Sequence, residues 1–176
     1  HLKRFDEAEA AYRRAIELDE KYAYPLANLA RLQVTHGNRS DANLSYRKAL
    51  EEASTDDDDI HLRLQAHLWL GNRDLAAQAL DRLAQTAAAG DASAFFCLRE
   101  QCWECHPMGL GLPLAELMEA CAWEAFLSPF SLALRAAASG EALAGAAPEV
   151  LTLAGEVLQE LRAFPVAIPA QAWRPT

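Results

Sequence analysis

Cys102, Cys105 and His106 form a C-x-x-C-H string, the pattern in this chain with the most specific chemical interpretation. In that pattern two thiols attach to the vinyl groups of a haem, and the histidine ligates its iron. Together with Cys97, the string could instead offer three sulfurs and one nitrogen to zinc, and Cys121 could complete such a site. A haem- or metal-binding redox module is therefore one alternative function.

Two observations favour buried, reduced cysteines over that alternative. Haem attachment of this type requires export, and no export signal is visible in the sequence. Structural zinc usually joins pairs of ligands across a loop, whereas these four candidate ligands fall on one predicted helix or at its end. Cysteine is a common small core residue in such a helix. We therefore expect no bound metal and no cofactor.

The other polar side chains form no recognisable catalytic motif. The sequence contains no nucleophile elbow, phosphate-binding loop or zinc-protease signature. His36, His61 and His67 lie on predicted helices and have no paired nucleophile. We therefore expect no enzyme activity in this chain.

The composition indicates which elements position these residues. Hydrophobic residues make up 52% of the chain and are mainly alanine and leucine, which favour helices over strands. The net charge is −9 and no basic cluster offsets it, so we expect no nucleic-acid partner. No apolar run reaches the roughly 18–20 residues that span a bilayer, so we expect no membrane insertion. Reduced cysteines fit a cytoplasmic location.

Four sets of equivalent residues recur with a spacing of 34 positions. The sets are Ala8, Ala42 and Ala76; Tyr12, Tyr46 and Leu80; Ala15, Ala49 and Leu83; and Gly37 and Gly71. The small residues let two antiparallel helices approach closely, and the large residues fill the space one turn later on the same face. The glycines can adopt the left-handed conformation that ends a helix. This pattern predicts tandem helical hairpins, with helices at about 4–19, 23–36, 39–53, 58–70 and 73–88.

In this register the chain resembles the tetratricopeptide repeat family over about residues 1–90. The matching residues are Phe5, Ala8, Tyr12, Ala15, Leu18, Leu26, Leu29, Ala30, Gly37, Ala42, Tyr46 and Ala49. The resemblance implies an all-α fold, a right-handed α-solenoid with a half repeat at 1–22 and whole repeats at 23–56 and 57–90. Because it opens with half a repeat, we expect the chain to be part of a longer protein. A second alternative function is therefore a sensor or oligomerisation arm of an enzyme whose catalytic domain lies upstream.

The repeat pattern ends near residue 90, and other helix signals follow. Asp91 can cap a helix to about residue 105, and Pro113 suits the first turn of a helix to about 126. Ser128 and Pro129 predict the start of a helix to about 138, and Pro148 the start of another that ends before 165. We expect residues 91–164 to form a divergent helical bundle that caps the array, followed by an extended tail at 165–176.

The resemblance also implies a concave groove, lined by the first helix of each hairpin, that binds a protein or peptide. By register, its lining residues are Tyr24, Asn28, Arg31, Thr35, His61, Gln65 and Trp69. Asn28 and Arg31 could bind a peptide backbone or carboxylate, and Trp69 could serve as an aromatic anchor. The main hypothesis is a non-catalytic interaction scaffold whose exposed array end could also associate with a second copy. It predicts that Arg31→Glu combined with Trp69→Ala abolishes partner capture without unfolding the domain.

Overall fold

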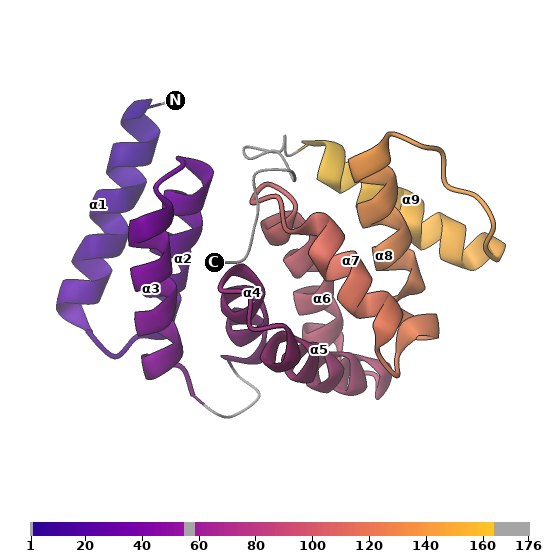
Figure 1. Cartoon of the computed structure of the whole chain (residues 1–176), viewed down its shortest axis with the longest axis horizontal. Coiled ribbons are helices and arrows are strands. Elements are labelled where there is room, and N and C mark those ends of the chain that lie inside the picture. Colours follow the sequence, from indigo (N-terminus) through magenta and orange to yellow (C-terminus); the bar gives the residue numbers. More distant parts are fainter. Residues whose placement is uncertain (1, 55–58, 164–176) are drawn as a thin grey trace.

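The computed structural model describes residues 2–54 and 59–163, and throughout this part the secondary structure is helical, with no strand (Figure 1). The helices are, in chain order, α1 (Leu2–Leu18), α2 (Ala23–Thr35), α3 (Arg39–Glu52), α4 (Ile60–Trp69), α5 (Arg73–Ala88), α6 (Ala92–Cys105), α7 (Gly111–Ala120), α8 (Glu124–Ser139) and α9 (Pro148–Ala163). The prediction of an all-α fold is thereby confirmed. None of these described helices combines the length and hydrophobicity needed to cross a lipid bilayer.

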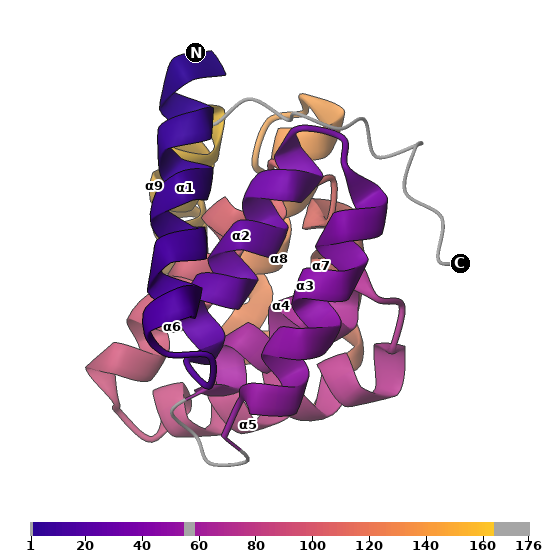
Figure 2. The ribbon, with the colours of Figure 1, turned by 90° about the vertical axis from the view of Figure 1, so that its left-hand side faces the viewer.

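Helices that follow one another in the chain pack side by side. The most extensive contacts join α2 with α3, α4 with α5, α7 with α8, and α8 with α9. In Figure 1, α1–α3 lie at one end of the molecule, α4–α6 in the middle and α7–α9 at the other end. Figure 2 shows α2 between α1 and α3. The middle helices therefore have neighbours on both sides, and their core is continuous with that of the two ends.

The residues that recur at 34-position spacing are part of this core in α3 and α5. Ala42 and Tyr46 of α3 are fully buried, and so are Ala76 and Leu80 of α5. A small residue followed one turn later by a large one allows close helix approach without leaving a cavity. In these two helices, the spacing in the sequence therefore identified the buried face correctly.

Gly37 and Gly71 end α2 and α4 with backbone φ angles of +80° and +78°. After each glycine, the next amide N–H donates back to a helix carbonyl: Asn38 N to Gln33 O, and Asn72 N to His67 O, both at 2.9 Å. This is the hydrogen-bond pattern of a helix that ends on a left-handed residue, a conformation that costs glycine little. The predicted role of both glycines is confirmed.

The predicted boundaries between α7 and α8 are wrong. α7 ends at Ala120 rather than near 126, and α8 begins at Glu124 and continues through Ser128 and Pro129. Proline has no N–H to donate, so the carbonyl four residues earlier, that of Ala125, loses its helical partner. The Ser128 hydroxyl donates to that carbonyl at 3.0 Å, which replaces the missing bond. The Ser128–Pro129 pair was predicted to start a helix. In the structure it lies inside α8, and the serine hydroxyl allows the helix to continue past the proline.

The other predicted helices agree with the structure to within about two residues at each described end. Asp91 caps α6 as predicted, because its side chain accepts from the N–H groups of Ser93 and Ala94 at 2.8 and 3.0 Å. The predicted junction of the two repeats at 56 and 57, the predicted start of a helix at 58 and the predicted extended tail at 165–176 all lie outside the described residues.

Candidate functional site

Three adjoining clefts form one groove between α2, α4 and α6. The outer cleft has a volume of about 310 Å³ and also borders α1; the central cleft has about 230 Å³, and the inner cleft about 280 Å³. Asn28, Arg31, Glu100 and Glu104 line both the outer and the central cleft. Tyr24 and His61 line both the central and the inner cleft. Because neighbouring clefts share walls in this way, they form one continuous surface, which is called the groove below.

Most of the residues predicted to line a groove do line this one. Those found in its walls are Tyr24, Asn28, Arg31, Thr35, His61 and Gln65. They come from α2 and α4, whose side chains at intervals of three and four residues face the same way. The opposite wall was not predicted: it is α6, which contributes Glu100, Trp103 and Glu104.

Trp69 does not line the groove. Its side chain is buried, its Nε1–H donates to Asn43 Oδ1 at 2.8 Å, and its ring centroid lies 6.4 Å from that of Tyr46. The guanidinium carbon of Arg39 lies 5.5 Å from the centroid of the indole ring. Trp69 is thus part of the core between α3 and α4, and in this structure it is not accessible as an anchor. For the same reason, a substitution at Trp69 perturbs packing and cannot test the groove alone.

A carboxylate from α6 already occupies the basic part of the groove. Glu104 forms an ion pair with Arg31, and it accepts a hydrogen bond from Gln65 Nε2 at 2.8 Å. Arg31 also donates to Asn28 Oδ1 at 3.1 Å. The side chains that the sequence suggested for binding a partner's carboxylate are therefore engaged with a carboxylate of the same chain.

This polar contact extends into the core below the groove. The Tyr46 hydroxyl donates to Gln65 Oε1 at 3.0 Å and lies 3.4 Å from Sδ of Met108. Burial raises the pKa of Tyr46 far above its ordinary value, so the phenol stays protonated and remains a donor. Gln65 is itself buried and uses both ends of its amide, one toward Tyr46 and one toward Glu104. These bonds fix the position of α6 relative to α3 and α4.

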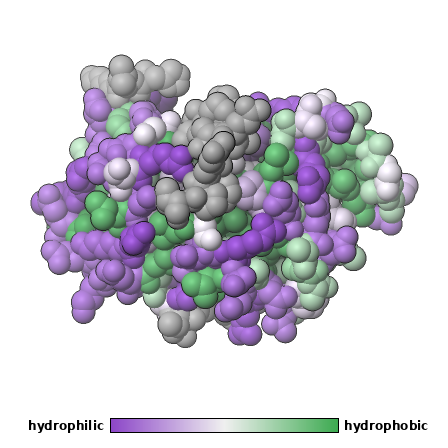
Figure 3. Space-filling view, in the orientation of Figure 1, coloured by the Kyte–Doolittle hydropathy of each residue, from purple (hydrophilic) through white to green (hydrophobic). Residues whose placement is uncertain are grey.

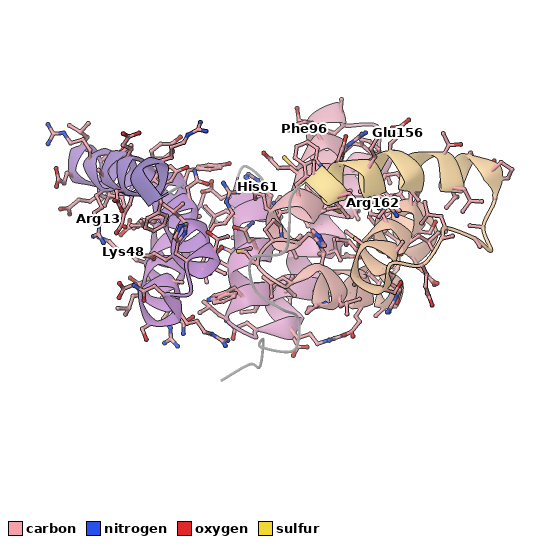
Figure 4. The ribbon with its side chains drawn as sticks, turned by 90° about the horizontal axis from the view of Figure 1, so that it is seen from above. Arg13, Lys48, His61, Phe96, Glu156 and Arg162 are labelled. Carbon is pink, nitrogen blue, oxygen red and sulfur yellow. The ribbon has the colours of Figure 1, made fainter. Side chains whose placement is uncertain are left out.

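Glu100 lies one turn before Glu104 on α6 and faces the same groove. In the described part of the chain, the Glu100 carboxylate takes part in no hydrogen bond or ion pair. Its charge favours the protonated form of His61, but burial has the larger effect and lowers the pKa of that imidazole. Figure 4 shows His61 between the helix that carries Arg13 and the helix that carries Phe96. The His61 ring centroid is 5.3 Å from that of Tyr24.

Trp103 is held in the wall of the outer cleft by α9. Its Nε1–H donates to Glu160 Oε2 at 2.7 Å, and its ring meets that of Phe96 edge-on at 5.9 Å. Arg99 also binds Glu160, with its Nε at 2.9 Å from Oε2. This bond to Arg99 lowers the pKa of the Glu160 carboxyl group, which therefore remains a charged acceptor. The indole of Trp103 is thus fixed before any ligand binds.

The cysteines and the histidine of the C-x-x-C-H string do not come together as a metal site. Cys102 and Cys105 are fully buried, and the Cys102 thiol lies 3.6 Å from the Leu98 carbonyl. Burial raises the pKa of both thiols far above the ordinary value, which disfavours the thiolate that a metal would need. Burial also lowers the pKa of His106. Within residues 2–54 and 59–163, no group of three or more His, Cys, Asp or Glu residues could hold a metal ion.

The face drawn in Figure 3 shows no large apolar patch among the described residues. There the described residues are mostly hydrophilic, and hydrophobic ones form separate small patches. Leu44 of α3 and Leu75 of α5 are exposed, and neither lines the groove. Scattered exposed leucines of this kind are normal on protein surfaces.

No protein-family model matches the chain, and comparison with curated proteins and with solved structures gives no significant match.

The groove residues that sequence reasoning missed include Tyr12 on α1, and Glu100, Trp103 and Glu104 on α6. The last three are spaced at i, i+3 and i+4, which places them on one face of a helix. That spacing was visible in the sequence. The contact between this face and α2 was not, because it joins residues more than 70 positions apart, as in the pair of Arg31 with Glu104.

Proposed function

We propose that this chain is a non-catalytic interaction module that binds a segment of a protein partner in the groove between α2, α4 and α6. The observation that supports this most directly is the continuity of the three clefts along α2 and α6, with walls that include six of the residues expected from the repeat register. A continuous, partly polar groove between helices suits an extended peptide, because the peptide backbone needs hydrogen-bonding groups along its length. The proposal includes the arrangement of the first five helices as a short right-handed solenoid of tetratricopeptide type.

One further observation is consistent with a binding role. The groove walls combine aromatic rings with hydrogen-bonding side chains, a composition typical of interfaces. The four cysteines, all in the described part of the chain, are free thiols, which supports our inference of a cytoplasmic protein.

The test begins with selection of peptides from a displayed random library on the purified chain. The affinity of the best peptides is then measured by fluorescence anisotropy for the wild type and for Asn28→Trp. Asn28 lines both the outer and the central cleft, so an indole there fills the place where they meet. The matched control is Leu44→Trp, which adds the same side chain at a site that is 67% exposed and outside the groove.

We expect Asn28→Trp to weaken binding at least about tenfold, a loss of roughly 1.4 kcal/mol, and Leu44→Trp to leave it unchanged. Circular dichroism should show the same helical content for all three proteins. The proposal fails if no peptide is selected, or if the selected peptides bind Asn28→Trp as tightly as the wild type.

A further inference from the structure

We propose that the outer cleft of the groove binds the guanidinium or ammonium group of an arginine or lysine in the partner, between the rings of Tyr12 and Trp103 and beside the Glu100 carboxylate. This inference rests on the proposed function, because it names the chemistry of the segment that the groove takes. It follows from the charges of the groove walls and from the aromatic residues of the outer cleft.

The charge of the groove favours a cation. The described residues in the groove walls include three carboxylates and one guanidinium group. The carboxylates belong to Asp91, Glu100 and Glu104, and the guanidinium group belongs to Arg31. The ion pair between Arg31 and Glu104 is neutral as a unit, and Asp91 caps α6 in the inner cleft. Glu100 is left with its negative charge facing the outer and central clefts. A partner's carboxylate would be repelled here, whereas a partner's cation would gain a charge-assisted hydrogen bond.

His61 does not reverse this balance. It lines the central and inner clefts, and burial lowers its pKa below the ordinary value, which favours the uncharged imidazole near neutral pH. The whole chain adds to the effect, since its net charge is −9 and attracts basic segments over a longer range.

The aromatic residues of the outer cleft provide the second element of a cation site. Tyr12 of α1 and Trp103 of α6 both line this cleft. A cation over the face of a tryptophan or tyrosine is attracted by the negative face of the ring, and the flat guanidinium of arginine also stacks on it. Because the hydrogen bond to Glu160 and the edge-on contact with Phe96 already hold the indole in place, little side-chain freedom is lost on binding.

The experiment is an NMR titration of the whole chain with Nα-acetyl-arginine amide, followed through the indole N–H signal of Trp103. The matched ligand is Nα-acetyl-citrulline amide, which has nearly the same shape but no charge. We expect the arginine amide to shift the Trp103 signal to saturation and to bind at least about fivefold more tightly than the citrulline amide. Equal affinity for the two ligands, or no shift of the Trp103 signal, overturns the inference.

Two protein variants test whether the Glu100 carboxylate causes the preference for the charged ligand. Glu100→Gln should reduce the preference for arginine over citrulline to less than about twofold. Glu51→Gln changes the net charge of the protein by the same amount at an exposed position on α3, and it should keep the full preference. A preference that survives Glu100→Gln contradicts the inference.

These results are separable from the test of the groove itself. If selected peptides bind the wild type, fail to bind Asn28→Trp and contain no basic residue, the groove is a peptide site and only the inference of a bound cation is wrong.

Discussion

Replacing Glu104 with alanine tests whether α6 is held against α2 and α4 in the way the structure indicates. The side chains of Glu104 and Arg31 are 20% and 28% exposed, so their ion pair is neither fully buried nor on the open surface. Exposed pairs are worth about 0–1 kcal/mol, and removing one partner of a buried pair costs about 3–5 kcal/mol. Because the exposure of this pair is intermediate, we expect its loss to lower the free energy of unfolding by about 1 kcal/mol.

The hydrogen bond to Gln65 adds to this cost. Glu104→Ala leaves Gln65 Nε2 without its carboxylate partner, and Gln65 is only 4% exposed, so water cannot easily replace that partner. An unsatisfied buried donor costs about 1–3 kcal/mol. Together the two effects predict a loss of about 2–3 kcal/mol in the free energy of unfolding. Glu104→Gln keeps an acceptor oxygen and should lose only about 1 kcal/mol.

The assay is urea denaturation followed by far-UV circular dichroism. A control is Glu116→Ala, because Glu116 and Arg73 form an ion pair with side chains that are 51% and 59% exposed. We expect this control to stay within about 0.5 kcal/mol of the wild type. A double-mutant cycle of Glu104→Ala with Arg31→Ala should give a coupling of about 1 kcal/mol. The reasoning is refuted if Glu104→Ala is no more destabilising than Glu116→Ala, or if the coupling is zero.

Three other predictions follow from buried or paired groups. Trp69→Ala should reduce the free energy of unfolding by about 3–5 kcal/mol, measured by urea denaturation, because the indole is a core group; a loss below about 1 kcal/mol would place it at the surface. Cys102 and Cys105 should react with an aromatic disulfide reagent only as fast as the protein unfolds, since both thiols are fully buried, and rapid labelling of the native protein would contradict this. The bond to Arg99 lowers the folded-state pKa of Glu160, so its stabilisation is present above the unfolded pKa and is lost as pH falls through the folded one. Urea denaturation should therefore show the wild type more stable than Glu160→Gln near neutral pH, with the difference shrinking below about pH 4; a difference that grows in acid would contradict the sign.

Local signals in the sequence predicted local structure well. Gly37 and Gly71 were recognisable as helix ends because a left-handed conformation favours glycine, and both adopt it. Asp91 was recognisable as a helix cap for a similar reason, since its short side chain can accept from the first amides of the helix. The end of α7 was missed because Pro129 usually signals a helix start, and its tolerance inside α8 depends on a hydrogen bond from Ser128.

The groove could be predicted only in part, because its two walls come from distant parts of the chain. The repeat spacing selected side chains of α2 and α4 that share a face, such as Asn28 and His61. Nothing local indicated that Glu104 would cross to Arg31, since ion pairs between distant segments depend on how the helices pack. Trp69 was misplaced because α4 is buried on most of its circumference, so helical periodicity could not distinguish its groove side from its core side.

Amide hydrogen exchange, measured with and without a library-selected peptide, tests the central claim most directly. If the partner lies in the groove, the added protection should fall on α2 and α6, whose side chains line all three clefts, and on α4, whose side chains line the central and inner ones. The same peptide should give no added protection in α7 and α8, which do not border the groove. Protection confined to α7 and α8, with none on α2, α4 and α6, would contradict the proposal that this groove is the binding site.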